Sequence, residues 1–372
     1  MDHVDYDSLD KAKLAFIEAS KRTLKFAKKY GFVPDGRLGG SSNTFSLNLK
    51  PYKKLRADEL IVTLLPEGLG TADDARPNDL SVEEQKEFWF NIGWKIVSAL
   101  TNDAAASGMQ TVLISLYLPT STPELVFNET FMKGFLEGFV EGCRTVGCVY
   151  FSGETPQLKT KIYPGKIDVA GSLFGLMPPG IAPVDGSELE AGNVMVFLGS
   201  NGPNENGFTT LRDLAIRLPE GYRSKLRDGQ QYWKAINNRS HLFTPFVQEL
   251  FKKGIQPTGL QPITGHGWQK IMRSRKPLRY VVEQMLPVPE IFQFVQKQLN
   301  LPPVEMLKIF NYGLGMVVFV KDQKEAKKVI AIAEKHKIPA IIGGHVEKAK
   351  ERQIFIKPLN VTLPGSSFLL QQ

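Results

Sequence analysis

Apolar side chains recur every three to four residues in several stretches of the chain, which is the spacing of an amphipathic helix. The clearest case is 322–336, where Asp322 can cap the first turn and an apolar stripe follows at Ala326, Val329, Ile330 and Ala333. The same period predicts further helices over residues 8–30, 84–106, 124–145, 207–217, 240–253 and 289–299.

Short apolar runs lie between these helices and end at turn-forming residues, which is typical of buried strands. They predict strands over residues 59–65, 111–118, 148–152, 168–176, 193–198, 314–320, 340–343 and 354–357. Because strands and helices interleave, we expect an α/β (α+β) fold. The chain has 372 residues, and residues 177–186 are rich in Pro and Gly. We therefore expect two domains, 1–183 and 184–372.

Composition narrows the class of protein. Hydrophobic residues make up 42% and charged residues 23%, which is typical of a globular chain and not of a disordered segment or a coiled coil. No apolar run approaches the ~18–20 residues that span a bilayer, and the first residues lack a secretory core. Cys143 and Cys148 are too few for a disulfide framework or a four-cysteine zinc site. We therefore expect a cytoplasmic protein with no membrane association.

The formal net charge of +8 leaves the partner open between nucleic acid, a membrane surface and phosphorylated small molecules. The densest basic stretch is 270–279, KIMRSRKPLR. Nucleic-acid binding would place basic residues among aromatic ones, and a single basic run is more often a solvated surface. We therefore do not expect a nucleic-acid partner.

Three segments of the N-terminal half carry residues suited to nucleotide and metal chemistry. Residues 67–72, EGLGTA, follow a predicted strand, and their glycines would let backbone N–H groups approach a phosphate, although an ordinary turn has the same composition. Asn102 and Asp103 interrupt an apolar helix, and residues 152–155 place Glu154 at the end of a strand. The carboxylates of these segments are the hard oxygen donors that Mg²⁺ prefers.

Three segments of the C-terminal half are candidates for ligand contacts. Residues 199–207 form a Gly/Asn/Ser loop before a helix with Arg212, which suits either an anion cradle or an ordinary loop. In 263–267, His266 stands between glycines as a ligand, a general acid or base, or a turn residue. Residues 310–316 place an asparagine and two glycines before a strand, which indicates a close backbone approach. No Ser/His/Asp order, HExxH or CxxC pair supports a protease or hydrolase.

Taken in order, these segments resemble the aminoimidazole ribonucleotide (AIR) synthetase family, the phosphoribosylformylglycinamidine cyclo-ligases. The resemblance runs from about Gly39 to Val320. The family motifs DGVGTK, Asn-Asp, GGET, SNG-helix-Arg, ITGGG and FNxGxGM are matched, in that order, by residues 67–72, 102–103, 152–155, 205–212, 263–267 and 310–316. The ordered series is more specific than any one motif.

The resemblance implies a two-domain AIR-synthase-like fold. Its N-terminal domains would pair to close a dimeric β-barrel, and a C-terminal α/β domain would follow. The resemblance also implies an ATP-dependent ligase of purine biosynthesis, in which Mg²⁺·ATP activates the amide oxygen of formylglycinamidine ribonucleotide and the amidine nitrogen closes the imidazole ring. Related families that use ATP include selenophosphate synthetase, thiamine monophosphate kinase and a hydrogenase maturation factor.

The same resemblance implies roles for individual residues. Catalytic roles fall to Asp103, Glu154 and His266, and metal binding to Glu67, Asp103 and Glu154. Contacts with ATP fall to Glu67, Gly68, Gly70, Thr71, Asn102, Gly153 and Thr155. Contacts with a phosphorylated small-molecule substrate fall to Asn201, Gly202, Asn206, Gly207, Arg212, Thr264, Gly265 and Asn311.

Several positions depart from the family pattern. The Asp of DGVGTK is Glu67 and its Lys is Ala72, and only Arg76 follows closely with a positive charge. The histidine often found before SNG is Asn204, and the middle glycine of ITGGG is His266. Three hypotheses follow: a divergent cyclo-ligase, a relative that binds nucleotide without this activity, and an ATP-dependent enzyme for another small molecule.

Overall fold

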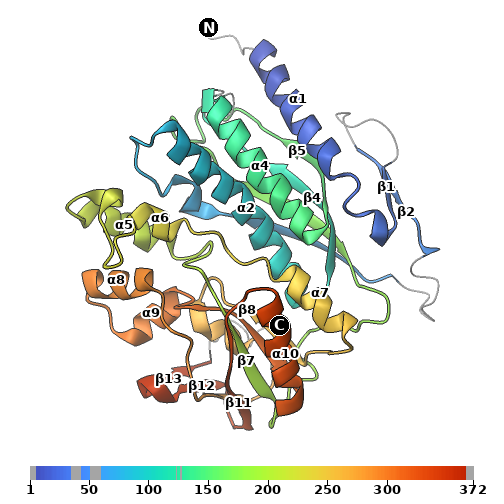
Figure 1. Ribbon diagram of the computed structural model, residues 1–372, viewed down its shortest axis with the longest axis vertical. Helices are drawn as coiled ribbons and strands as arrows, with labels where there is room; N and C mark the ends of the chain where they lie inside the picture. The colour runs from blue at the N-terminus through green and yellow to red at the C-terminus, as the bar shows by residue number, and fades with distance from the viewer. Residues whose placement is uncertain (1–5, 35–42, 51–59, 123, 126–127, 366–372) are drawn as a thin grey trace. The chain divides into compact units, whose positions relative to one another are not determined.

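The fold is divided into two compact units. The computed structural model describes residues 6–34, 43–50, 60–122, 124–125 and 128–365 (Figure 1). Unit 1 comprises the described parts of Met1–Ala105 and Met109–Gly180, and unit 2 those of Ala106–Gly108 and Ile181–Gln372. The chain passes from unit 1 to unit 2 within the turn-rich stretch 177–186. Across the residues that are described, no helix is long and apolar enough to cross a membrane.

Unit 1 is built on a four-stranded sheet in the order β3-β6-β4-β5. Its strands are β3 (Val62–Gly68), β6 (Ala170–Leu176), β4 (Gln110–Tyr117) and β5 (Val149–Glu154). β4 and β5 are parallel, as a connection through a helix allows, and the other neighbours are antiparallel. The helices of the unit are α1 (Tyr6–Thr23), α2 (Val82–Ala106) and α4 (Glu129–Val146), of which α4 connects β4 to β5.

Glycines bring α2 and α4 into backbone contact. A Cβ added at Gly138 of α4 would lie 1.9 Å from the carbonyl oxygen of Phe90 on α2. One added at Gly93 of α2 would lie 2.1 Å from the carbonyl oxygen of Phe135 on α4. Because protein interiors are close-packed, larger side chains at these positions would push the helices apart. The glycines therefore fix the spacing of the helix pair.

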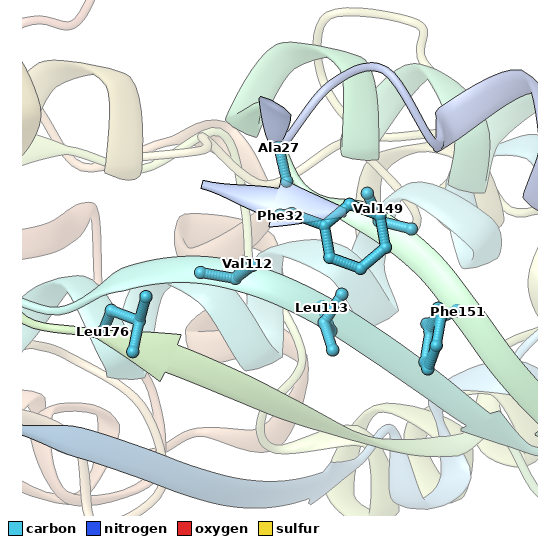
Figure 2. Packing of buried hydrophobic residues seen from close by; sticks show 7 residues of the cluster. All are labelled: Ala27, Phe32, Val112, Leu113, Val149, Phe151 and Leu176. Carbon is cyan, nitrogen blue, oxygen red and sulfur yellow. The ribbon is translucent and has the colours of Figure 1, made fainter. Parts of the chain in front are cut away.

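A hydrophobic cluster joins a small hairpin to the unit 1 sheet (Figure 2). Its buried members are Ala27, Phe32, Val112, Leu113, Val149, Phe151 and Leu176. Phe32 lies on β1 (Phe32–Pro34), which pairs with β2 (Phe45–Leu47) in a two-stranded sheet. The rings of Phe32 and Phe151 meet edge to face with centroids 5.7 Å apart. The hairpin is thus held to the sheet by aromatic packing.

Unit 2 contains a seven-stranded sheet in the order β13-β12-β9-β11-β7-β10-β8. Its strands are β7 (Val194–Gly199), β8 (Gly259–Pro262), β9 (Leu278–Val282), β10 (Leu314–Val320), β11 (Ala340–Lys348), β12 (Gln353–Ile356) and β13 (Val361–Pro364). Every residue of β7 and β10 is buried, so these strands form the centre of the core. Helices α5 (Phe208–Arg217), α6 (Tyr232–Ile236), α7 (Thr244–Lys252), α8 (Glu290–Leu299), α9 (Pro303–Ile309) and α10 (Gln323–Lys335) complete the unit.

The helix predicted over 322–336 is confirmed. It is α10, and the Oδ1 of Asp322 accepts the N–H of Glu325 at 2.8 Å as an N-cap. The helix predicted from residue 124 is only partly continuous: Glu124 and Leu125 are helical, and α4 itself begins at Glu129. Asn128 sets this start, because its Oδ1 accepts two backbone N–H groups of the first turn at 2.9 and 3.2 Å.

The helix predicted over 8–30 is wrong at its C-terminal end. α1 ends at Thr23, and a separate short turn, η1 (Lys28–Tyr30), follows. The hydroxyl of Thr23 donates to the carbonyl oxygen of Ser20 at 2.8 Å and accepts the N–H of Tyr150 at 2.9 Å. Periodicity along the chain cannot register this contact with a distant strand, so the helix looked longer than it is.

Candidate functional site

The glycine-rich turn predicted at 67–72 lies at the end of β3. Glu67 and Gly68 are the last residues of the strand, and η3 (Gly70–Asp74) follows directly. Gly70 has a φ of +55°, and a Cβ added there would meet no heavy atom within 4 Å. Gly70 therefore supplies a left-handed backbone conformation, which glycine adopts at little cost, and leaves open space above the turn.

Asp103 lies on α2, and one of its carboxylate oxygens indicates a ligand site in unit 1. Its Oδ1 is buried, and the described residues provide no hydrogen-bond partner for it. A buried acceptor left unpaired costs on the order of 1–3 kcal/mol, more for a charged group. Such an atom in a folded chain requires an explanation, and a bound cation or donor is one. Asp103 is the strongest ligand candidate of this unit.

Glu67 and Glu154 point to opposite faces of the unit 1 sheet. Residues that lie opposite one another on the four strands form a row across the sheet. Glu67 and Gly171 belong to one such row, and Glu154 belongs to the next row along the strands. Successive positions along a strand face opposite sides. The row of Glu67 faces α2, since a Cβ added at Gly171 would lie 3.2 Å from Cδ1 of Leu100 on that helix. Glu154 therefore points away from α2.

The structure does not bring the three carboxylates onto one cation. β6 and β4 lie between β3 and β5, so a strand spacing of ~4.8 Å separates Glu67 from Glu154 by roughly 14 Å along the sheet. Mg²⁺ holds its ligands at about 2.1 Å. In the described part of the chain, no group of three or more His, Cys, Asp or Glu side chains is arranged for a metal. Glu67 lies on the side of the sheet that faces α2, and Asp103 lies on α2 itself.

The position that matches the family lysine is closed to solvent. Ala72 is 1% exposed. Arg76 donates from Nη1 to the carbonyl oxygen of Asp73 at 2.7 Å, and its guanidinium lies 4.8 Å from the ring centroid of Phe88 and 4.5 Å from that of Trp89. Stacking on these rings holds the charge of Arg76 against α2.

Asp73 is a buried carboxyl that the sequence did not single out. Its side chain is 3% exposed, and Oδ2 accepts the N–H of Val169 at 3.0 Å. Burial, assisted by the charges of Asp168 and Asp74, raises the pKa of Asp73 to about 8 against the opposing hydrogen bond from Val169. Asp73 is therefore mostly neutral at pH 7 and ties η3 to the start of β6. In the sequence, the alanines at 72 and 75 hint that Asp73 is buried.

The glycine of the segment 152–155 has a packing role. A Cβ added at Gly153 would lie 2.6 Å from Oη of Tyr150. Thr71 and Thr155 are half-buried, one beyond the end of β3 and the other beyond the end of β5. Asn102 is buried on α2. The contacts of these residues with a nucleotide remain predictions.

Three predicted substrate segments meet at one end of the unit 2 sheet. β10 lies between β7 and β8 and is antiparallel to both. The loops that follow β7 and β8 therefore lie beside the loop that precedes β10. These loops contain residues 200–207, 263–266 and 310–313.

Asn311 links two of these loops from the inside. It is 2% exposed. Its Nδ2 donates to the carbonyl oxygen of Gly202 at 2.8 Å, while its Oδ1 accepts the hydroxyl of Ser200 at 2.8 Å and the N–H of Gly313 at 3.0 Å. The Asn311 side chain is thus used within the protein as a structural link.

The loop after β7 is fastened to a segment before α7 that the sequence did not single out. Asn201 Nδ2 donates to the carbonyl oxygen of Arg239 at 3.2 Å, and Asn238 Nδ2 donates to that of Asn201 at 3.1 Å. The hydroxyl of Ser240 donates to Oε1 of Glu205 at 2.6 Å. These tertiary hydrogen bonds have no spacing signal in the sequence, which is why the segment was missed.

Two further glycines show how closely the unit 2 loops pack. A Cβ added at Gly207, the N-cap of α5, would lie 2.3 Å from Cε1 of Phe310. One added at Gly265 would lie 3.5 Å from Oδ1 of Asn206. Arg212 is half-buried on α5.

The segment 263–267 places one lysine beside the predicted site. The Nζ of Lys270 contacts Oγ1 of Thr264. His266 is exposed and precedes η5 (Gly267–Met272) with a φ of +69°. A glycine adopts this conformation without strain, which gives a structural reason for the glycine of the family motif. His266 is held at a turn, and its catalytic role remains a prediction.

Two basic residues of the stretch 270–279 have contacts within unit 2. Lys276 Nζ donates to two backbone carbonyl oxygens of the segment before β7, at 2.5 and 2.9 Å. Arg279 lies 4.9 Å from the ring centroid of Phe355. Lys276 and Arg279 therefore contact other parts of unit 2, although neither is buried.

Comparison with known proteins finds a family model that is similar to part of unit 1. Residues 77–177 match the family model described as AIR synthase related protein, N-terminal domain. This segment of the chain is thus similar to the N-terminal domain of AIR-synthase-related proteins. The matched segment contains Asn102, Asp103 and Glu154. The match confirms the resemblance inferred from the ordered motifs.

Curated relatives extend the similarity over most of the chain, at low identity. The phosphoribosylformylglycinamidine cyclo-ligase of Staphylococcus carnosus is 25% identical over 326 residues, which cover 86% of this chain and 88% of that protein. The enzyme of the same name from Methanocaldococcus jannaschii is 27% identical over 280 residues, 75% and 78% of the two chains. The chain is a divergent relative of these proteins.

Solved structures with the same fold include a hydrogenase maturation protein and a kinase. The E. coli hydrogenase maturation protein HypE superposes with a TM-score of 0.61 at 18% identity, covering 96% of both chains. Thiamine-monophosphate kinase from Stenotrophomonas maltophilia gives a TM-score of 0.59 at 15% identity, covering 91% and 95%. The expected two-domain AIR-synthase-like α/β fold is thereby confirmed. At these identities the likeness concerns the fold alone.

Proposed function

We propose that this protein is an ATP-dependent ligase that converts formylglycinamidine ribonucleotide to aminoimidazole ribonucleotide in the cytoplasm. The observation that carries the proposal is Asp103, which lies in the matched domain and keeps a buried carboxylate oxygen without a partner in the described structure. The names of the curated relatives, which span most of both chains, support the same reaction. A solved complex of HypE with ATP supports ATP as the cofactor.

The residues of unit 1 would act mainly by positioning and charge balance. Glu67 and Asp103, on the α2 side of the sheet, would hold Mg²⁺ with the phosphates of ATP, and the metal would neutralise charge on the transferred phosphoryl group. Thr71 and Thr155, at the same end of the sheet, would contact the nucleotide. Glu154 faces the other side, so in this proposal it acts through a separate contact.

The unit 2 loops would hold the ribonucleotide. Asn201, Asn206, Thr264 and Arg212 are at least partly exposed, and three of the four stand on loops fixed at the same sheet end. Buried hydrogen bonds of Asn311 fix the loops before the substrate arrives. Preorganisation of this kind lowers the entropic cost of binding.

A homodimer is part of the proposal. β3 is an edge strand of the unit 1 sheet, and on its face away from α2 Leu64 is 76% exposed and Val62 50% exposed. Apolar edge strands left open to water favour pairing with another strand. A second copy of the same sheet would cover these side chains.

One observation favours a second candidate function. Ala72 is buried where the family has its motif lysine, and Arg76 is engaged with aromatic rings. A phosphate contact of the family is therefore absent at this place. A relative that binds nucleotide without this reaction, or that phosphorylates another small molecule, accommodates the change.

The test is release of ADP and phosphate by the purified protein with Mg²⁺·ATP and formylglycinamidine ribonucleotide. We expect turnover that depends on the ribonucleotide and falls by about 100-fold or more in Asp103→Asn, which removes one charge at constant shape. Asp213→Asn, exposed on α5, is the matched control and should retain activity. ATP binding with no such turnover would move the conclusion to the second candidate, and turnover with another phosphorylated acceptor such as thiamine monophosphate would identify a kinase.

A further inference from the structure

Lys270 stands on a rigid support beside the unit 2 loops. The turn that carries it, η5, starts at Gly267, where an added Cβ would lie 2.0 Å from the carbonyl oxygen of Leu307. One residue on, Trp268 donates from Nε1 to the carbonyl oxygen of Asn311 at 2.8 Å. η5 is thus held against α9 and against the loop before β10.

The end of the Lys270 side chain lies at the predicted substrate segment. Its Nζ contacts the hydroxyl of Thr264. The next residue, Gly265, lies against Oδ1 of Asn206 from the loop after β7. Lys270, Thr264 and Asn206 are all partly exposed, so a ligand can reach them. A cation, a hydroxyl and an amide therefore stand together at one end of the sheet.

The other charges of the same basic stretch are placed differently. Lys276 is bonded to backbone carbonyl oxygens, and Arg279 is stacked on Phe355. Arg275 is exposed. Arg273 is exposed as well. Of these five basic residues, Lys270 is the one that contacts a predicted substrate residue.

We propose that Lys270, together with the hydroxyl of Thr264, binds the phosphate monoester of the substrate. The proposal rests on the proposed function in taking the substrate to be a phosphorylated sugar derivative. A lysine ammonium held on a fixed turn gives charge-assisted hydrogen bonds to phosphate oxygens, and the Thr264 hydroxyl adds a neutral donor. One of the positive charges behind the net charge of +8 would then bind the substrate rather than a nucleic acid.

The experiment measures binding of ribose 5-phosphate to the full chain by calorimetry, without ATP, alongside ribose and inorganic phosphate. We expect ribose 5-phosphate to bind, and ribose to bind far more weakly. Lys270→Met should weaken ribose 5-phosphate binding on the order of 10- to 100-fold, and Thr264→Val by a smaller factor. Arg275→Met removes one charge of the same stretch and should leave binding within about twofold, since exposed charges are screened. Thermal melting of each variant shows that it is folded, and Lys270→Arg should restore part of the affinity.

Each outcome decides the proposal. Equal losses in Lys270→Met and Arg275→Met, no loss in Lys270→Met, or no phosphate-dependent binding by the unaltered protein would each overturn it. Displacement of ribose 5-phosphate by a non-hydrolysable ATP analogue would also overturn it, because the site would then belong to the nucleotide. Binding that behaves as expected in a protein without cyclo-ligase turnover would leave the phosphate site standing and reject the proposed function.

Discussion

The buried carboxyl of Asp73 makes the stability of unit 1 depend on pH. Burial raises its pKa from 3.8 to about 8 in the folded chain, while the unfolded chain keeps the ordinary value. Below about pH 4 the carboxyl is protonated in both states and has no effect. Between about pH 4 and pH 8 only the unfolded state releases the proton, so the free energy of unfolding falls by about 1.4 kcal/mol per pH unit. Above pH 8 both states are ionised and the loss stops.

The replacement Asp73→Asn should remove this dependence. An asparagine keeps the shape and an oxygen that can accept the N–H of Val169, and it does not ionise. At pH 7, about three pH units above the ordinary pKa, the buried carboxyl has lowered the free energy of unfolding by on the order of 4 kcal/mol. The variant should regain this amount. This is an upper value, because local opening of η3 lets water reach the ionised carboxylate. The gain should shrink to nothing near pH 4.

The assay is urea unfolding of both proteins from pH 5 to pH 9, with hydrogen exchange of residues 69–76 to localise the effect. The matched control is Asp74→Asn, which breaks the partly exposed ion pair with Lys166 and should cost about 1 kcal/mol or less. Because Asp73 is unchanged in this control, its stability should still fall as the pH rises. The reasoning is refuted if Asp73→Asn is less stable than the original chain at pH 7–8, or if both lose stability with the same slope.

Three further predictions concern packing and assembly. Gly267→Ala should lower the free energy of unfolding by about 3 kcal/mol or more, because its Cβ would meet a carbonyl oxygen at 2.0 Å, whereas Gly229→Ala, with open space around it, should cost only about 1 kcal/mol in denaturant titrations. Leu64→Lys should convert a dimer to a monomer in light scattering, and an unchanged mass would reject β3 as the interface. Ala72→Lys should lower the melting temperature without raising turnover, since it buries a charge; higher turnover would contradict this.

Much of the architecture follows from local signals in the sequence. Asp322 and the apolar stripe after it define α10, because a cap and a helical period act within a few residues. The ordered motifs likewise indicated the family, since each is a short local pattern. Where a distant contact decides, as at Thr23 and Tyr150, the predicted helix end was wrong.

In the candidate site, too, local signals and distant contacts decided different features. The sequence by itself determined which carboxylates, amides and glycines are present and at which strand and helix ends they stand. Only the tertiary structure decided that Glu67 and Glu154 face opposite sides of one sheet, that Asp73 is buried and that Lys270 reaches Thr264. The physical reason is that alternation along a strand fixes faces within that strand, whereas the relation between strands depends on register and on pairing with segments far away in the chain.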